Sequence, residues 1–307
     1  LYEWVGSVGD RLFFRTTAGA PNGRVIAVEA PDPSPERWRE VVAEREQRLD
    51  AASLVGGHLV AQYLQDARSR VRVHRLDGTL RNEVALPGSG TTWGFPEDPD
   101  RGETFFAYTD YLTPPTLYRY DVVSDTVSTY RQPASAFDPS PYVARQVFYA
   151  SRDGTRVPMT LVRRRAEPLD GSDPLLLYGY GGFDISLTPM YSPAVAAWLE
   201  MGGVYAVANL RGGGEYGSAW HAAGTGLAKQ NVFDDFIAAA EWLLREGYSS
   251  KRRLAIAGRS NGGLLVGATL NQRPDLFAAA LPGVGVLDML RYHTASANAY
   301  QWSSDYG

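Results

Sequence analysis

The sequence predicts two parts with different folds, an all-β part followed by an α/β part. Up to about residue 132, short runs of alternating apolar and polar residues are separated by Pro, Gly and Asp, and helical periodicity is nearly absent. From about residue 146, continuous apolar runs alternate with amphipathic stretches of helical spacing. A proline-containing stretch at 133–141 separates the two patterns. We therefore predict domains at 1–135 and 136–307.

The first part has the pattern of repeated antiparallel sheets. Strands are predicted at 71–74 and 117–120, and the first of them ends at the turn pair Asp77 and Gly78. A propeller blade takes roughly 40 to 50 residues, so this part corresponds to about three blades, whereas a closed ring needs about four to eight. We therefore expect the C-terminal blades of a β-propeller, with an incomplete ring.

The second part begins with a predicted β-hairpin. Its strands cover 146–149 and 157–162, and Asp153 with Gly154 supplies the turn. Apolar strands at 175–178 and 204–208 come next along the chain, with a short helix between them.

A longer amphipathic helix and another strand follow. Asn231 is in position to cap this helix, Phe236 lies on its apolar face, and Gly247 ends it. A strand at 254–257 comes directly afterwards. Alternation of apolar strands with helices predicts a largely parallel sheet that is covered by helices on both faces.

Composition excludes several kinds of site. The 307 residues contain no cysteine, so disulfides, thiolate metal sites and a cysteine nucleophile are ruled out. The formal net charge of -4 provides no positive field to attract nucleic acid or an anionic membrane. No apolar run reaches the roughly 18 residues of a membrane-spanning helix, since Glu200 interrupts the longest candidate. Peptides and small molecules remain as ligands.

The clearest chemical signal is a G-x-S-x-G pattern centred on Ser260. It lies between the strand at 254–257 and a predicted helix at 264–271. A sharp turn from strand to helix lifts the serine hydroxyl out of the sheet, and glycines on either side tolerate the strained backbone. The helix N-terminus then faces the oxyanion that develops during acyl transfer. The alternative is an ordinary glycine-rich turn in which Ser260 caps the helix.

A second glycine-rich loop suggests another class of protein. Residues 212–217 fit G-x-G-x-x-G after a strand, and Asp234 and Asp235 lie near the spacing of a ribose-binding acid. Glu215, however, would place a carboxylate in the loop that should hold pyrophosphate, and no strongly periodic helix begins at Ser218. Dinucleotide binding is therefore the weaker interpretation.

Six motifs follow one another in the second part, and together they resemble one family. In this order they are similar to the prolyl oligopeptidases, serine peptidases in which a β-propeller caps an α/β-hydrolase domain. The resemblance covers most of the chain and is tightest from about residue 147. Asn261, directly after the serine, favours this branch over dipeptidyl and acylaminoacyl peptidases. The motifs are YGYGGF at 178–183, NLRGGGEYG at 209–217, KQN at 229–231, FDDF at 233–236, SNGGLL at 260–265 and NQRPDLF at 271–277.

The resemblance implies a role for particular residues of the chain. Ser260 would be the nucleophile, and the Tyr180 hydroxyl with the Asn261 backbone N–H would form the oxyanion hole. The walls of a proline pocket would come from Phe183, Val286, Trp302 and Tyr306, with Trp302 packed against the pyrrolidine ring. No metal or organic cofactor is implied. The chain departs from the family pattern in having Arg259 before the serine and one extra residue between His293 and Trp302.

Ser260 lacks an obvious base in this sequence. In this fold the order along the chain is Ser, then Asp or Glu, then His. Only His293 follows the serine, and Asp288 and Asp275 are the only acids before it, without further strand and loop units to bring them to the sheet edge. We therefore expect the triad Asp and His to lie outside the chain, and the chain to be an internal fragment of a longer peptidase.

The sequence as a whole predicts a serine endopeptidase that cleaves short peptides on the carboxyl side of proline. By resemblance, the propeller restricts access to short, unstructured peptides. We expect a cytoplasmic monomer that binds neither nucleic acid nor membrane. The alternatives are another peptidase or esterase of the same fold, and a non-catalytic propeller and hydrolase-like scaffold that only binds its partner.

Overall fold

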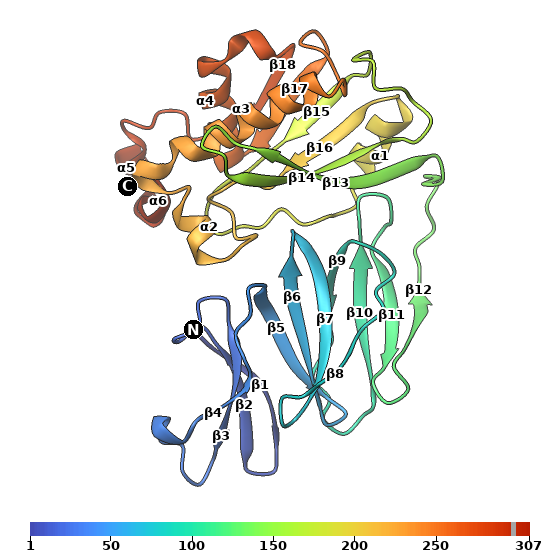
Figure 1. Ribbon diagram of the computed structural model, residues 1–307, viewed down its shortest axis with the longest axis vertical. Helices are drawn as coiled ribbons and strands as arrows, with labels where there is room; N and C mark the ends of the chain where they lie inside the picture. The colour runs from blue at the N-terminus through green and yellow to red at the C-terminus, as the bar shows by residue number, and fades with distance from the viewer. Residues whose placement is uncertain (296–298) are drawn as a thin grey trace. The chain divides into compact units, whose positions relative to one another are not determined.

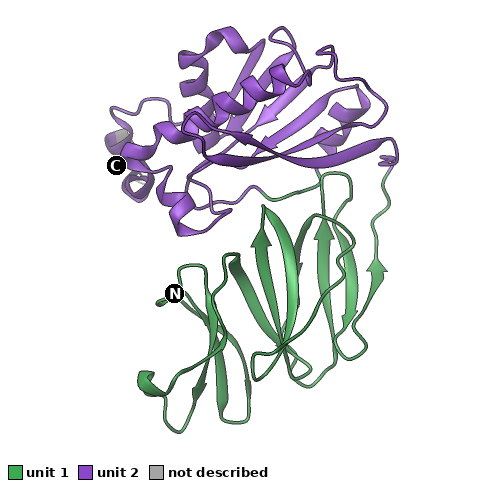
Figure 2. Ribbon diagram, in the orientation of Figure 1, with its two compact units in different colours: residues 1–135, 188–191 green, residues 136–187, 192–307 purple. Residues whose placement is uncertain are grey.

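A computed structural model describes residues 1–295 and 299–307, and the chain divides into two compact units. The first unit comprises residues 1–135 and 188–191, and the second comprises residues 136–187 and 192–307 (Figure 1 and Figure 2). The boundary follows Ser135, inside the proline-containing stretch. Each unit has its own hydrophobic clusters, which are the basis for describing them separately.

Within the described residues, the first unit is built from three four-stranded sheets of antiparallel strands. Each sheet pairs strands that follow one another in the sequence, as expected for propeller blades. A single 3-10 turn, η1 (Pro35–Arg37), interrupts the strands of this unit. The strands are β1 (Tyr2–Val8), β2 (Arg11–Thr16), β3 (Arg24–Glu29), β4 (Arg39–Val42), β5 (Arg48–Val55), β6 (His58–Gln65), β7 (Arg68–Arg75), β8 (Leu80–Glu83), β9 (Thr91–Gly94), β10 (Glu103–Thr109), β11 (Thr116–Asp121) and β12 (Thr126–Arg131).

The sheet formed by β5–β8 contributes side chains to two hydrophobic clusters, one on each face. Strand β6 has six buried residues in succession, because its two faces belong to different clusters. Leu59 and Ala61 pack with Phe13 of the first sheet, whereas Val60 packs with Phe106 of the third. Side chains of a strand alternate between faces, so neighbouring residues of β6 fill both layers.

A short segment of the later sequence also belongs to the first unit. Residues 188–191 run beside the third sheet, where the Thr91 hydroxyl donates to the Pro189 carbonyl at 2.7 Å. The Tyr191 N–H donates to the Thr109 hydroxyl oxygen at 3.2 Å. The chain therefore enters the second unit, returns to the first for four residues, and continues in the second.

The second unit contains one mixed sheet in the order β13-β14-β16-β15-β17-β18. The first two strands form the predicted hairpin, and β14 pairs with β16 in antiparallel fashion. The strands β16, β15, β17 and β18 are parallel to one another. The predicted change from an all-β part to an α/β part is therefore confirmed. The strands are β13 (Tyr142–Ala150), β14 (Arg156–Arg164), β15 (Leu175–Tyr178), β16 (Val204–Ala208), β17 (Leu254–Arg259) and β18 (Ala279–Gly283).

Helices cover this sheet and place loops at its carboxyl edge (Figure 1). Helix α3 packs Phe236 and Ala240 into the core with Leu175 and Ile256 of the sheet. None of the helices in the described part of the chain has the length and apolar composition needed to cross a membrane. The helical segments are α1 (Pro193–Glu200), α2 (Ser218–Ala222), η2 (Gly226–Ala228), α3 (Gln230–Arg245), α4 (Asn261–Gln272), η3 (Pro274–Leu276), α5 (Tyr292–Ala295) and α6 (Ala299–Tyr306).

The start of α3 differs from the prediction. The helix begins at Gln230, so Asn231 lies inside its first turn rather than at the cap. The Asn231 amide donates to the Ala223 carbonyl at 2.9 Å instead of accepting from the helix. Asn is favoured at helix caps because it competes for nearby backbone groups, and here that preference is met by a loop carbonyl.

Candidate active site

Ser260 lies at a strained turn between β17 and α4. Its backbone has φ 58° and ψ -117°, a conformation that is costly for a residue with a side chain. Two glycines let the start of α4 approach the end of β17 and the loop after β15 closely. A Cβ atom at Gly258 would lie 2.3 Å from the Gly262 carbonyl oxygen, and one at Gly262 would lie 2.6 Å from the Gly179 oxygen. The turn leaves Ser260 exposed at the carboxyl edge of the sheet.

Two hydrogen-bond donors lie beside this serine. The Tyr180 phenol, from the loop after β15, interacts with the Ser260 side chain. The backbone N–H of Asn261 opens α4, where the first N–H groups of a helix have no carbonyl partner in a preceding turn. Burial raises the pKa of Tyr180, so the phenol remains protonated and able to donate at neutral pH. This pair is suited to stabilising an oxyanion on a carbonyl attacked by Ser260.

The buried side chain of Asn261 joins the separate loops of the site. Its amide nitrogen donates to the Tyr180 carbonyl at 2.6 Å, and its amide oxygen accepts from the Tyr306 hydroxyl at 3.2 Å. Gly182 packs directly on this amide, since a Cβ atom there would lie 2.5 Å from the Asn261 nitrogen. The family resemblance implied a role only for the backbone of Asn261. The two contacts of its side chain could not be predicted, because both partners are distant in sequence.

Two of the four predicted wall residues are in contact. The rings of Phe183 and Tyr306 meet edge to face with centroids 5.4 Å apart, although Phe183 follows β15 and Tyr306 ends α6. Val286, after β18, and Trp302, on α6, are half-buried. Within the described residues, Trp302 makes no ring contact with Phe183 or Tyr306. A complete four-walled pocket therefore remains a prediction.

The histidines of the second unit are engaged away from Ser260. The His221 Nε2 atom lies 3.2 Å from an Asp305 carboxylate oxygen. His293 is exposed, and its ring lies against Tyr292 with centroids 5.7 Å apart. In the part of the second unit that the structure describes, no histidine is hydrogen-bonded to Ser260.

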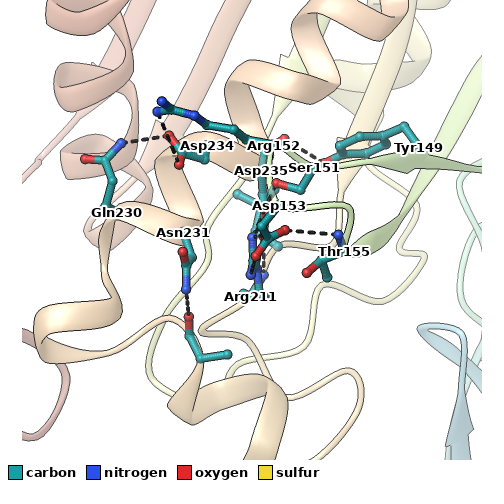
Figure 3. A network of polar contacts seen from close by, with 12 residues as sticks. Tyr149, Ser151, Arg152, Asp153, Thr155, Arg211, Gln230, Asn231, Asp234 and Asp235 are labelled. Atoms are coloured by element: carbon teal, nitrogen blue, oxygen red, sulfur yellow. Dashed lines mark hydrogen bonds and ion pairs between the residues drawn. The ribbon is translucent and has the colours of Figure 1, made fainter.

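A buried ion network holds the glycine-rich loop at 209–217 beside the site (Figure 3). Arg211 is 5% exposed and forms a two-pronged contact with Asp235 of α3, at distances down to 2.6 Å. It also binds Asp153 in the β13-β14 turn at 2.5 Å. That hydrogen bond lowers the pKa of Asp153 to about 2. The network links the hairpin, the loop and α3. It could not be predicted from the sequence, because the arginine and the two aspartates are far apart in the chain.

Glu215 fills the loop that could have been a phosphate cradle. One carboxyl oxygen accepts from the Leu187 N–H at 2.9 Å and from the Asn209 amide at 3.1 Å. The other oxygen would lie 2.2 Å from a Cβ atom at Gly213, so the glycine is needed to admit the carboxyl group. The loop is closed by its own side chain, which argues against the dinucleotide interpretation.

An exposed serine on a strained turn, with a phenol and a helix N-terminal amide beside it, is the arrangement of a serine hydrolase of the α/β type. Family comparisons agree with this class. Residues 189–307 match the prolyl oligopeptidase family, and residues 1–133 match the N-terminal β-propeller domain of prolyl oligopeptidase. The chain belongs to the prolyl oligopeptidase family.

Individual relatives agree along the whole chain. A prolyl endopeptidase of Elizabethkingia miricola is 48% identical over 303 residues, which is 99% of this chain and 43% of the relative. A solved structure from an analysis of two prolyl endopeptidases matches with a TM-score of 0.93 at 45% identity, covering 100% of this chain and 45% of the other. Prolyl oligopeptidase B of Galerina marginata, bound to a 25mer macrocyclization substrate, matches with a TM-score of 0.92 at 31% identity, covering 100% and 43%.

These matches confirm the predicted fold class, propeller blades followed by an α/β-hydrolase domain. The chain spans less than half the length of the relatives that it matches.

Proposed function

We propose that the protein containing this chain is a serine endopeptidase that hydrolyses short peptides on the carboxyl side of proline. The observation that carries the proposal is Ser260 on its strained turn, with the Tyr180 phenol beside its side chain. The Phe183 and Tyr306 rings, which meet edge to face, supply two aromatic walls that suit an apolar pyrrolidine ring. Relatives named prolyl endopeptidase support the same reaction.

The proposed mechanism is acyl transfer. The Ser260 oxygen attacks the prolyl carbonyl carbon while its proton passes to a histidine, and the Tyr180 hydroxyl and the Asn261 N–H stabilise the tetrahedral oxyanion. Collapse breaks the peptide C–N bond, and the histidine returns the proton to the leaving amine. Water then repeats the sequence and frees the peptide acid and Ser260.

We place the triad histidine and aspartate outside these 307 residues. The two histidines of the second unit support this view, because His221 is engaged by Asp305 and His293 lies against Tyr292. The proposal also includes peptide ligands, for which the substrate-bound Galerina marginata relative is support. We further propose that the protein is a cytoplasmic monomer that binds neither nucleic acid nor membrane. Size-exclusion chromatography tests the oligomeric state, and cell fractionation tests the location.

Reaction with a fluorophosphonate probe tests the nucleophile directly. The probe is applied to the 307-residue chain and to a protein with the full length of the relatives, with Ser260→Ala as the matched control. We expect an adduct at Ser260 in the longer protein and none in the chain alone. Labelling of the chain alone would mean that it contains a base, whereas no labelling of either would favour the non-catalytic scaffold.

A peptide series tests the specificity. The peptides differ only in the residue before the scissile bond, which is proline, alanine or arginine. Preference for proline in kcat/KM supports the proposal. Equal cleavage of all three, or cleavage of esters alone, would assign the protein to another peptidase or esterase of the same fold.

A further inference from the structure

Asp305 is a buried carboxylate behind the proposed proline pocket. It lies on α6, directly before Tyr306, and is only 1% exposed. One carboxylate oxygen accepts the Phe183 backbone N–H at 2.9 Å. The other lies 3.2 Å from the His221 Nε2 atom. A single carboxylate thus connects α6 with the loop after β15 and with α2.

A buried lysine faces the same carboxylate. The Lys229 ammonium lies 3.9 Å from Asp305, donates to the Gly181 carbonyl at 3.1 Å, and lies 5.4 Å from the centre of the Tyr306 ring. Burial lowers the pKa of Lys229 to about 8, and the negative charge of Asp305 acts in the opposite direction. Lys229 and Lys251 are the only lysines among the 30 basic residues of the chain. A compact ammonium can fit this enclosed space, whereas the broad guanidinium fork of arginine is harder to place there.

Phe183 needs this support because its backbone is strained. Its φ is +58°, in the left-handed region that a bulky side chain seldom adopts, and φ of the following Asp184 is +56°. Such conformations persist only where surrounding contacts determine them. The hydrogen bond from the Phe183 N–H to Asp305 is one of those contacts, and the same carboxylate precedes the Tyr306 ring that Phe183 meets.

We propose that Asp305, together with Lys229 and His221, is a positioning group that sets the placement of Phe183 and Tyr306 and thereby the selectivity for proline. Asp305 acts through these two rings and touches no substrate itself. The inference rests on the proposed function, because it concerns the pocket that this function needs. Displacement of either ring widens the apolar slot, and a small misplacement of binding groups lowers the rate of a well-fitted substrate more than that of a poor one.

The test uses a protein with the full length of the relatives and two short peptides that differ only by proline or alanine before the scissile bond. The variants are Asp305→Ala and Asp305→Asn, with Asp275→Asn as the matched control, because Asp275 is an exposed carboxylate that pairs with Lys251. Fluorophosphonate titration of Ser260 counts the active sites, so misfolded molecules do not enter the rates.

We expect Asp305→Ala to lower the ratio of kcat/KM for proline over alanine by roughly tenfold or more, mainly through KM for the proline peptide. Asp305→Asn keeps an oxygen that can accept from the Phe183 N–H but loses the negative charge. Its ratio of kcat/KM for proline over alanine should therefore lie between those of Asp305→Ala and the wild type. The Asp275→Asn control should keep the wild-type ratio. A loss of stability alone would lower kcat/KM equally for the proline and the alanine peptide. An unchanged ratio of the two kcat/KM values in the Asp305 variants would therefore overturn the inference.

If Asp305→Ala does not fold, the ratio of kcat/KM for proline over alanine in Asp305→Asn tests the inference in the same way. A wild type without any preference for proline would reject the proposed function itself. The inference is then decided by a crystal structure of Asp305→Asn. Displacement of Phe183 or Tyr306 from their edge-to-face contact would support it, and unmoved rings would refute it.

Discussion

Replacement of Glu215 with glutamine should remove a pH dependence of folding that this buried carboxyl group creates. Glu215 is 2% exposed, and one of its oxygens has no hydrogen-bond partner among the described residues. Burial raises its pKa from 4.5 to about 7, against the opposing effect of the Leu187 N–H and the Asn209 amide. The folded state therefore holds a proton between pH 4.5 and about 7 that the unfolded state has released.

The sign and size of the effect follow from these two pKa values. A raised pKa in the folded state gives stability that is complete below pH 4.5 and is lost as pH rises through about 7. At 1.36 kcal/mol for each pH unit, the interval corresponds to about 3 kcal/mol, of which about 2.5 kcal/mol falls between pH 5 and pH 8. Glutamine cannot titrate. The free energy of unfolding of Glu215→Gln should therefore rise by about 2.5 kcal/mol relative to that of the wild type between pH 5 and pH 8.

Urea unfolding at pH 5 and pH 8, followed by tryptophan fluorescence and circular dichroism, measures the difference. Glutamine also changes the hydrogen bonding of the loop, but that contribution is the same at both pH values and cancels in the comparison. The control is Glu246→Gln, an exposed glutamate for which we expect no such difference. Free energies of unfolding that change in parallel for Glu215→Gln and the wild type would refute the reasoning.

Three further predictions concern the site and its supports. In the full-length protein, Tyr180→Phe should lower kcat roughly 100- to 1,000-fold with little change in KM, since an oxyanion donor is lost; Tyr178→Phe is the control, and equal rates for both variants would exclude Tyr180 from the oxyanion hole. Arg211→Met should destabilise the second unit by about 3 to 5 kcal/mol in urea unfolding, because Asp235 is left buried without its partner; a loss below about 1 kcal/mol would contradict this. Gly181→Ala, whose Cβ would lie 2.3 Å from a Val232 methyl, should cost about 1 to 3 kcal/mol more than Gly154→Ala, which has the same left-handed backbone but open space; similar losses of thermal stability would show that the loop yields freely.

Much of the fold could be predicted because the relevant signals are local. The alternation of side chains along β7 and the apolar run of β15 indicate strands within a few residues. The strained turn at Ser260 was predictable for the same reason, since its glycines and its flanking strand and helix are contiguous. The cap of α3 was mispredicted because Asn231 has a loop carbonyl as partner, and no local pattern reveals that choice.

The site itself was predicted only in part. The family resemblance pointed to Tyr180, Phe183 and Tyr306 as site residues. The structure brings the rings of Phe183 and Tyr306 into contact. The same resemblance named Val286 and Trp302, whose roles remain predictions. Neither pattern nor resemblance indicated Asp305, because an aspartate in a polar helical stretch looks like a surface residue until its partners are known.

The sequence by itself determined the order of the two folds, the position of the nucleophile turn and the absence of cysteine chemistry, since each depends on composition or on neighbours within one turn or strand. The tertiary structure decided which polar groups are buried together. Asp305 meets Phe183 from 122 residues away and His221 from 84 residues away. Contacts over such separations form only when the sheet has brought distant loops to one edge, and a buried charge is stable there only because those loops supply its partners.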